Sequence, residues 1–183
     1  LVENNWLDDL QYLCEPTEYH EKRITSKFIC DRGVSHELVR HRVFSFAQES
    51  TRYCNYSKDK FGNELTFIKP SWLDMKDKDE NQEVSRLWNI DLLDICSLIS
   101  EEESLDNRDT FLGSLMMSEY SYSNLLKNGA TPQEARAILP NALKTEIVMT
   151  GFESDWEGFF KLRCDKAAHP DMQVLANKLK ELV

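Results

Sequence analysis

The sequence predicts an α+β fold, a single helix-rich domain over residues 1–183 with a small and mostly antiparallel sheet. Apolar residues recur at helical spacing in several long segments, whereas only two short segments have the composition of strands. These strands do not alternate regularly with helices, as the strands of a parallel sheet do. A hydrophobic content of 41% in 183 residues is enough for one core.

Two segments are predicted to form strands. Residues 23–30 alternate in polarity and are rich in β-branched and aromatic side chains. Residues 65–68 have a similar composition and end at Pro70, which has no N–H to donate to a neighbouring strand. The polar residues 55–63 between the two candidates are typical of a turn.

Apolar spacing and end signals predict the helices. Asp31 is placed to cap a short helix that runs towards Arg40, and Thr131 begins a capping box with proline at the first helical position. Ser154 begins a second box of this pattern, and Gly129 follows a helical stripe as a C-terminal cap. The predicted helical segments are 6–13, which Pro16 ends, 32–40, 84–99, 111–126, the segment from 131, 154–163 and 172–182, with a solvated acidic turn at 101–107.

Composition argues against several classes of protein. The chain has 22 basic and 32 acidic residues, and its net charge of −10 disfavours partners such as nucleic acid or an anionic membrane. It has neither an apolar run of the roughly 20 residues that a membrane span needs nor a secretory signal. Its five cysteines form no C-x-x-C pair, so we expect no metal site, no disulfide framework and a reduced, cytoplasmic location. The chain opens without Met on a helical pattern, so we expect part of the protein to precede it.

A basic island interrupts the acidic sequence at residues 40–53. It contains Arg40, His41 and Arg42 and then Arg52, interleaved with aromatic residues. The arginine guanidinium is a planar, permanently charged fork that suits phosphate and carboxylate oxygens. The aromatic neighbours favour partial burial, and a partly buried arginine needs a partner. The island is therefore a candidate anion site, although such charges are also typical of a solvated cluster paired with acids.

Two later arginines add to this hypothesis. Arg136 lies one turn inside the helix that Thr131 caps, and Arg163 lies two turns after Trp156 on an apolar helix face. An arginine on such a face points at the interior of the protein or at a ligand bound there. A buried pair between Arg163 and a carboxylate explains the spacing equally well.

These residues form two blocks that resemble the signature of the flavin-dependent thymidylate synthases. The first block is the Arg-His-Arg triplet at 40–42, followed by Ser50 and Arg52. The second block consists of residues 135–140, Thr145, Thr150 and residues 159–164. Two blocks in the same order are far more specific than either alone, and the resemblance covers residues 28–178.

The resemblance implies an α+β homotetramer whose active sites form between subunits. Such an enzyme converts dUMP to dTMP by reductive methylation, with FAD, NADPH and 5,10-methylenetetrahydrofolate. Reduced flavin supplies the hydride and relays the one-carbon unit, so the protein mainly positions and polarises its ligands. Because no enzyme nucleophile attacks the pyrimidine, Ser50 is not expected to be one, and His41 is interpreted as a cofactor contact rather than a general base.

The same resemblance implies a ligand for each site residue. Arg163 lies at the uracil edge as the candidate catalytic residue, because a fixed cation favours the ring ionised at N3. The residues implied to contact FAD are Arg40, His41, Arg42 and Gln48. The residues implied to bind dUMP are Glu37, Arg40, Gln48, Glu49, Ser50, Arg52, Arg136 and Arg163.

The chain departs from the family pattern mainly on the flavin side. Phe152, Ser154 and Gly158 stand where the family often has polar flavin contacts, and Ala167 replaces a histidine. Glu37 stands where a nucleotide-binding glutamine is usual. A family segment with a His and a Glu lies upstream of the part that the sequence covers. The dUMP half of the site is therefore the better represented half.

Two other classes of protein compete with the enzyme. The first is a pyrimidine-nucleotide-binding relative without flavin chemistry, which acts as a binding or assembly module. The second is a nucleic-acid binder that uses the basic island, and the net charge of −10 disfavours it. Flavin absorbance of the purified protein distinguishes the enzyme from the module.

Overall fold

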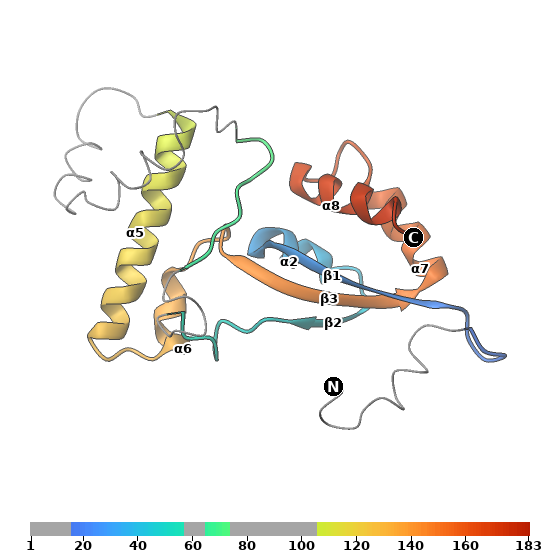
Figure 1. Ribbon diagram of the computed structural model, residues 1–183, viewed down its shortest axis with the longest axis horizontal. Helices are drawn as coiled ribbons and strands as arrows, with labels where there is room; N and C mark the ends of the chain where they lie inside the picture. The colour runs from blue at the N-terminus through green and yellow to red at the C-terminus, as the bar shows by residue number, and fades with distance from the viewer. Residues whose placement is uncertain (1–15, 57–64, 74–105) are drawn as a thin grey trace.

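A computed structural model describes residues 16–56, 65–73 and 106–183, and in them it confirms the predicted α+β fold (Figure 1). The described part contains three strands and five α-helices. In chain order the elements are β1 (Arg23–Asp31), α2 (Arg32–Leu38), β2 (Ser45–Gln48), α5 (Asn107–Lys127), α6 (Pro132–Ala135), the 3₁₀ turn η3 (Arg136–Ile138), β3 (Lys144–Phe152), α7 (Glu153–Arg163) and α8 (Pro170–Lys180).

The central strand of the sheet is β3, which pairs antiparallel with β1 on one side and with β2 on the other. Phe28 of β1 lies opposite Ile147, and Phe46 of β2 lies opposite Met149. Side chains alternate between the two faces of a strand, so these four residues share one face. Ile147 and Met149 are fully buried on it, whereas Lys27 on the other face is exposed.

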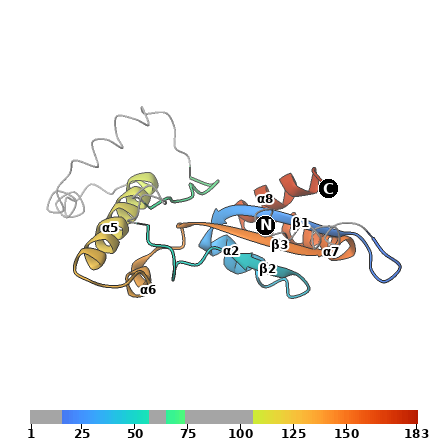
Figure 2. The ribbon, with the colours of Figure 1, turned by 60° about the horizontal axis from the view of Figure 1, so that its bottom comes forward.

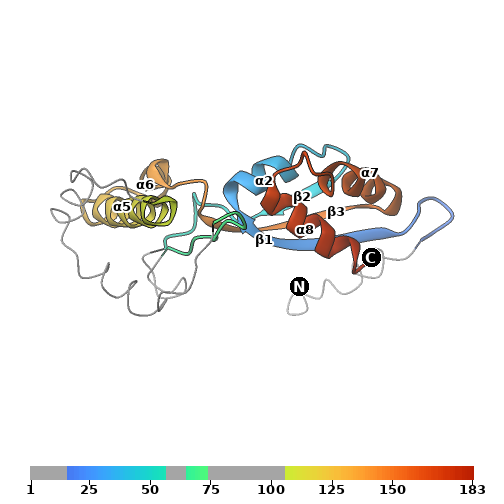
Figure 3. The ribbon, with the colours of Figure 1, turned by 90° about the horizontal axis from the view of Figure 1, so that it is seen from above.

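One layer of helices covers the buried face of the sheet. The helices α2, α7 and α8 lie on the same side of the strands, as Figures 1 and 3 show. Trp156 and Phe159 of α7 and Met172 of α8 are almost completely buried against Phe28 and its neighbours. Burying each such side chain stabilises the fold by about 1.5–3 kcal/mol, so this cluster is the main source of stability for the sheet.

A second apolar cluster lies beyond the end of the sheet where β3 begins. Figures 1 and 2 show α5 and α6 there, apart from the other helices. Tyr122 of α5 and Ala135 of α6 pack with Tyr56, Leu65 and Leu143. Leu143 of this cluster directly precedes β3, so no linker separates the second cluster from the sheet along the chain.

Several predicted helix ends are confirmed. The Asp31 carboxylate accepts a hydrogen bond from the Val34 N–H at 2.7 Å and so caps α2, which ends at Leu38 before the basic island. Gly129 follows α5 with a φ of +93°, a conformation that glycine adopts at least cost. The capping box at Thr131 is also present, although the α-helix it begins spans only Pro132–Ala135 and continues as η3. The last helix is present as α8, and α7 ends at Arg163 as expected.

Two local predictions are wrong. Residues 65–68 form no strand: among the described residues they pair only through the isolated bridge between Phe67 and Leu143, the residue just before β3. Ser154 does not cap α7, which begins one residue earlier. The Asp155 carboxylate instead accepts from the Phe152 N–H at 3.1 Å, and the Ser154 hydroxyl donates to Glu21.

The strands β2 and β3 were not among the predicted elements. Four other predictions lie outside the described residues: the helices at 6–13 and 84–99, the acidic turn at 101–105 and most of the polar turn at 55–63.

Gly151 is the position where the packing of this core is most easily tested. A Cβ added there would lie 2.4 Å from Cδ1 of the buried Phe44 ring. We expect Gly151→Ala to lower the free energy of unfolding by about 1–3 kcal/mol, because the ring has to shift in a packed core. Urea denaturation measures the change. Gly113→Ala in α5 is the control: its methyl group meets nothing within 4 Å, and it should stabilise the helix by up to about 1 kcal/mol. Equal stabilities of the two variants would contradict this packing.

Candidate functional site

The guanidinium of Arg163, at the end of α7, is held by the C-terminal end of α2. Its Nη1 donates to Oε2 of Glu37 at 2.6 Å, and its Nη2 donates to the backbone oxygen of Glu37 at 3.1 Å. Its Nε donates to Nε2 of His41 at 2.8 Å. The Arg163 side chain is only 14% exposed. The structure therefore contains the arginine–carboxylate pair that the spacing allowed, and it brings three of the predicted site residues into contact.

His41 lies between this pair and the aromatic core. Its ring meets the Phe159 ring edge-on with centroids 5.0 Å apart, and the Phe44 ring with centroids 6.2 Å apart. Burial of the imidazole lowers the pKa of His41 below its ordinary value, and the positive charge of Arg163 lowers it further. The ring is therefore held neutral at physiological pH.

A cavity of about 380 Å³ adjoins Arg163 along the second half of α7 and the turn that leads to α8. Its lining residues are Gly158, Lys161, Leu162, Arg163, Asp165, Ala167 and Ala168. A Cβ on Gly158 would meet nothing within 4 Å, so this helix face is open. Two of the four positions that depart from the family's flavin contacts, Gly158 and Ala167, therefore lie in the same wall as Arg163.

Phe152 and Ser154 lie elsewhere. Phe152 carries the Arg23 guanidinium 4.4 Å above its ring and stacks with His20, and Ser154 is bonded to Glu21. These contacts tie the end of β3 to the segment that leads into β1.

Gln48 is held in a polar network beneath α2. Its Nε2 donates to the hydroxyl of Ser35 at 2.8 Å and to that of Thr145 at 3.2 Å. Nη1 of Arg32 donates to the Thr145 hydroxyl at 3.4 Å. Ser35 and Thr145 are completely buried, so each depends on these partners for hydrogen bonding. Ser35 and Arg32 were not among the predicted site residues, and the inward-facing hydroxyls on α2 and β3 are the signal that would have identified this network.

A second group of predicted site residues lies beside α6. Nε of Arg52 donates to the side-chain oxygen of Gln133 at 2.7 Å, and the guanidinium lies over the ring of Tyr53. The Ser50 hydroxyl accepts from the Arg52 N–H at 3.3 Å, and Arg136 is exposed on the adjoining η3 turn. The N–H of Glu49 continues the pairing of β2 by donating to the Glu146 oxygen at 2.9 Å.

The second group lies beside α6, at the end of the sheet where β3 begins, whereas the first joins the end of α7 to the end of α2 (Figure 1). Within the described ranges, no hydrogen bond or ion pair links Arg52 or Arg136 with Arg163 or His41.

The arginines of the site differ in whether a carboxylate neutralises them. Arg163 is paired with Glu37, whereas Arg52 is bonded to a neutral amide. The exposed side chains of Arg40, Arg42 and Arg136 form no ion pair or hydrogen bond with any residue that the structure describes. In a chain with a net charge of −10, these cations remain free to bind an anion.

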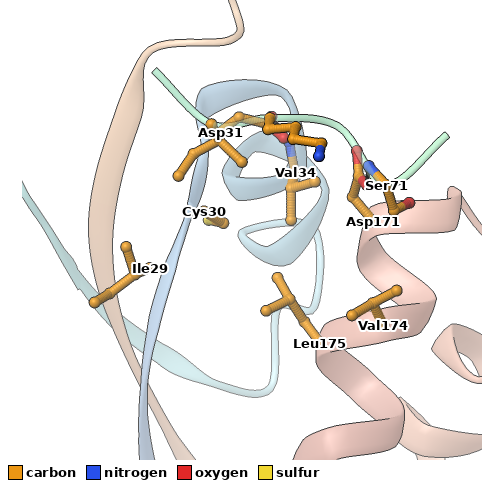
Figure 4. A pocket seen from close by; sticks show the side chains of 10 residues that line it. Ile29, Cys30, Asp31, Val34, Ser71, Asp171, Val174 and Leu175 are labelled. Atoms are coloured by element: carbon orange, nitrogen blue, oxygen red, sulfur yellow. Dashed lines mark hydrogen bonds between the residues drawn. The ribbon is translucent and has the colours of Figure 1, made fainter. Parts of the chain in front are cut away.

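A smaller cavity of about 150 Å³ lies between β1, α2, α8 and residues 68–71 (Figure 4). Its walls are mainly apolar, and at one end the Ser71 N–H donates to the Asp171 carboxylate at 2.5 Å. Burial raises the pKa of Cys30 in this wall to about 12, so its thiol stays protonated and is a poor nucleophile. None of the predicted site residues lines this cavity.

Among the described residues, no three His, Cys, Asp or Glu side chains are grouped as ligands of a metal ion. No helix in the described ranges has the length and apolar character to cross a membrane.

Comparison with known proteins links the chain to one family. Residues 19–183 match the family described as "Thymidylate synthase complementing protein". A flavin-dependent thymidylate synthase of Corynebacterium aurimucosum is 32% identical over 145 residues, which are 79% of this chain and 51% of that protein. The enzyme of that name from Geobacter sulfurreducens is 27% identical over 152 residues, 83% of this chain and 52% of that protein. The flavin-dependent thymidylate synthase of Pyrococcus furiosus is 28% identical over 154 residues, which are 84% of this chain and 51% of that protein. The chain thus spans about half the length of the curated relatives it matches.

The network around Gln48 predicts a specific loss of stability. Thr145→Val keeps the shape of the side chain but removes the oxygen that accepts from Gln48 and Arg32. We expect the free energy of unfolding to fall by about 1–3 kcal/mol, the cost of leaving buried donors without an acceptor. Thr150→Val on the same strand is the control, because its hydroxyl bonds only Thr25 near the open face and its loss should cost less. Chemical denaturation measures the free energy of unfolding of both variants. Equal losses in the two variants would contradict a stabilising role for the hydrogen bonds to Thr145.

Proposed function

The chain belongs to the family of thymidylate synthase complementing proteins, and on that premise we propose that it carries the nucleotide-binding part of a flavin-dependent thymidylate synthase. In this proposal the whole protein converts dUMP to dTMP with FAD, NADPH and 5,10-methylenetetrahydrofolate. The observation that carries the proposal is the set of exposed arginines without a carboxylate partner among the described residues, Arg40, Arg42 and Arg136, at the positions of the family signature. In a chain with a net charge of −10, exposed cations that no described carboxylate neutralises are the groups available to an anionic ligand.

The phosphate of dUMP is assigned to the group beside α6. Arg52 keeps its full charge because its partner, Gln133, is neutral, and Arg136 lies exposed on the next turn. A phosphate dianion suits the two guanidinium forks and the Ser50 hydroxyl. This assignment leaves the pyrimidine ring to the other group.

The pyrimidine ring is assigned to the wall that contains Arg163. The guanidinium there is mostly buried and fixed by three hydrogen bonds, so its charge is preorganised. Although Glu37 pairs with Arg163, Nη1 and Nη2 each keep a second N–H that can donate to the ring. Donors fixed in this way stabilise an ionised ring more than a neutral one, and this is the proposed role of Arg163 in the reaction.

The residues present also fit a flavin dinucleotide. Arg40 and Arg42 offer unpaired charges for a diphosphate, and the missing side chain of Gly158 leaves open space beside Arg163. A bound flavin would supply the hydride for the reduction. His41, Arg40 and Arg42 are its proposed contacts, and Gln48 supports them from within its buried network.

A complete site needs more than one chain in this proposal. The groups around Arg52 and Arg163 are held by different elements, α6 and the junction of α7 with α2, and no hydrogen bond or ion pair among the described residues links them. A second copy that places its α6 beside α7 would complete the site. Closed symmetry makes such an exchange reciprocal, which supports a homo-oligomer, and the family resemblance makes the proposed assembly a homotetramer.

The experiment that tests this function uses the complete protein. It should be purified with flavin absorbance and should form dTMP from dUMP only when NADPH and methylenetetrahydrofolate are both present. A protein that binds dUMP but shows neither flavin absorbance nor dTMP formation would favour the binding or assembly module instead. A protein that does not bind dUMP would refute both.

Arg52→Ala tests the phosphate assignment. We expect dUMP binding to weaken by about 2–5 kcal/mol in calorimetry, because the variant loses a charge-assisted contact to the phosphate. Deoxyuridine, which has no phosphate, should bind both proteins equally. Lys127→Ala, which removes an exposed positive charge at the end of α5, controls for general electrostatics and should change little. Unchanged dUMP affinity in Arg52→Ala would remove this residue from the site.

Mixing two variants tests whether the site is shared between chains. We expect Arg52→Ala and Arg163→Lys each to lower dTMP formation at least roughly tenfold, because lysine keeps the charge of Arg163 but loses the planar fork. When the two are co-expressed, roughly a quarter of the sites should regain both arginines by random assortment. The turnover of the mixture should rise accordingly above that of either variant. Failure of the mixture to gain activity would place both residues in the same chain's site.

A further inference from the structure

The contact between Arg163 and His41 determines where the imidazole carries its proton. Nε of Arg163 donates to Nε2 of His41 at 2.8 Å. A guanidinium has only donors and stays protonated in proteins. Nε2 must therefore present a lone pair, and the proton of the neutral ring is on Nδ1.

Glu37 determines how the guanidinium meets the imidazole. Its carboxylate and its backbone oxygen accept from the two terminal nitrogens of Arg163, at 2.6 Å and 3.1 Å. Because Nη1 and Nη2 both donate to Glu37, the planar guanidinium is fixed in one orientation. In that orientation Nε points at His41. Glu37 has no hydrogen bond with His41 among the described residues and acts on it only through Arg163.

We propose that Glu37 is a positioning residue that, through Arg163, holds His41 as a neutral imidazole with its proton on Nδ1, ready to donate to a ligand. Within the described residues, Nδ1 of His41 has no hydrogen-bond partner. The ligand is then one that offers an acceptor atom, a carbonyl oxygen or an unprotonated ring nitrogen. Its identity as a flavin or a pyrimidine rests on the proposed function, but the state of the ring does not.

The charges around His41 agree with a neutral ring. Arg163 faces the imidazole from α7. Arg40 and Arg42, which flank His41 in the sequence, add two exposed cations. Phe159 and Phe44 meet the imidazole in T-shaped contacts and have no oxygen or nitrogen that could accept its proton. The Glu37 carboxylate on α2 is engaged by Arg163. A second proton on His41 would remove the acceptor for Arg163 and place two cations in contact.

The proposal is tested by ¹⁵N NMR of the histidine side chains in the ligand-free complete protein. We expect His41 of the wild type to show a protonated Nδ1 and a bare Nε2 at neutral pH. Glu37→Gln keeps an oxygen for Nη1 and should keep this tautomer. Glu37→Ala and Arg163→Met should release the ring, so that the Nε2-protonated form, which free histidine favours in water, becomes the major species. The titration midpoint of His41 should then rise by about half a pH unit or more in Arg163→Met.

Internal and matched controls make the outcome decisive. His36, exposed on α2, should give the same signals in every variant, and core signals from Trp156 report that each variant is folded. A wild type with Nε2 protonated, or an unchanged His41 tautomer in Arg163→Met, would overturn the proposal. Loss of the Nδ1-protonated form in Glu37→Gln would also overturn the proposal, because an acceptor for Nη1 at position 37 would then not be enough to orient Arg163. If Glu37→Ala does not fold, the other two variants decide. The NMR experiment uses no ligand, so a protein without thymidylate synthase activity could still show the proposed tautomer. Conversely, a different tautomer would not refute the proposed enzyme function.

Discussion

β3 is paired on both sides, and the register of those pairs places Gln48 in the polar network beneath α2. Opposite β1 it aligns Phe28 with Ile147, and opposite β2 it aligns Gln48 with Ile147, two residues along β3 from Thr145, whose hydroxyl accepts from Gln48. A slip of one residue would turn the inward residues of β3 to the open face and expose the core. The burial of Ile147 and Met149 thus holds the register, and the register holds the polar network beneath α2.

The site contains two kinds of arginine. Arg163, the last residue of α7, is mostly buried, where a cation without a partner would be costly. Glu37 and His41 are its partners and fix the direction of the guanidinium. Beside α6, Arg52 and Arg136 are exposed and need no carboxylate, so their charge remains available for a ligand. Burial therefore decides which arginines depend on partners within the protein and which remain exposed.

Local signals predicted the elements whose stability is local. Asp31 and Gly129 were identified as helix ends because capping depends on residues within one turn. Residues 65–68 resembled a strand, but the part of the chain that the structure describes pairs with them only at the isolated bridge of Phe67. β2 and β3 were missed, because β2 has only four residues inside a basic motif and a strand's stability depends on the partners that flank it. The burial of β3 alternates, but its sequence does not alternate in polarity, because Thr145 and Gly151 lie on the buried face and Val148 and Phe152 on the other.

By itself, the sequence determined the residue types of the site, the order of its two blocks and hence the family to which the chain is similar. It also placed Arg163 on an apolar helix face, which limited its environment to a ligand or a carboxylate. Only the tertiary structure decided between these, because Glu37 and Arg163 are 126 residues apart and no local pattern connects them. The inward direction of Gln48, the tautomer of His41 and the separation of Arg52 from Arg163 have the same origin. Each depends on how β3 joins distant segments, and contacts of that kind arise from packing rather than from sequence spacing.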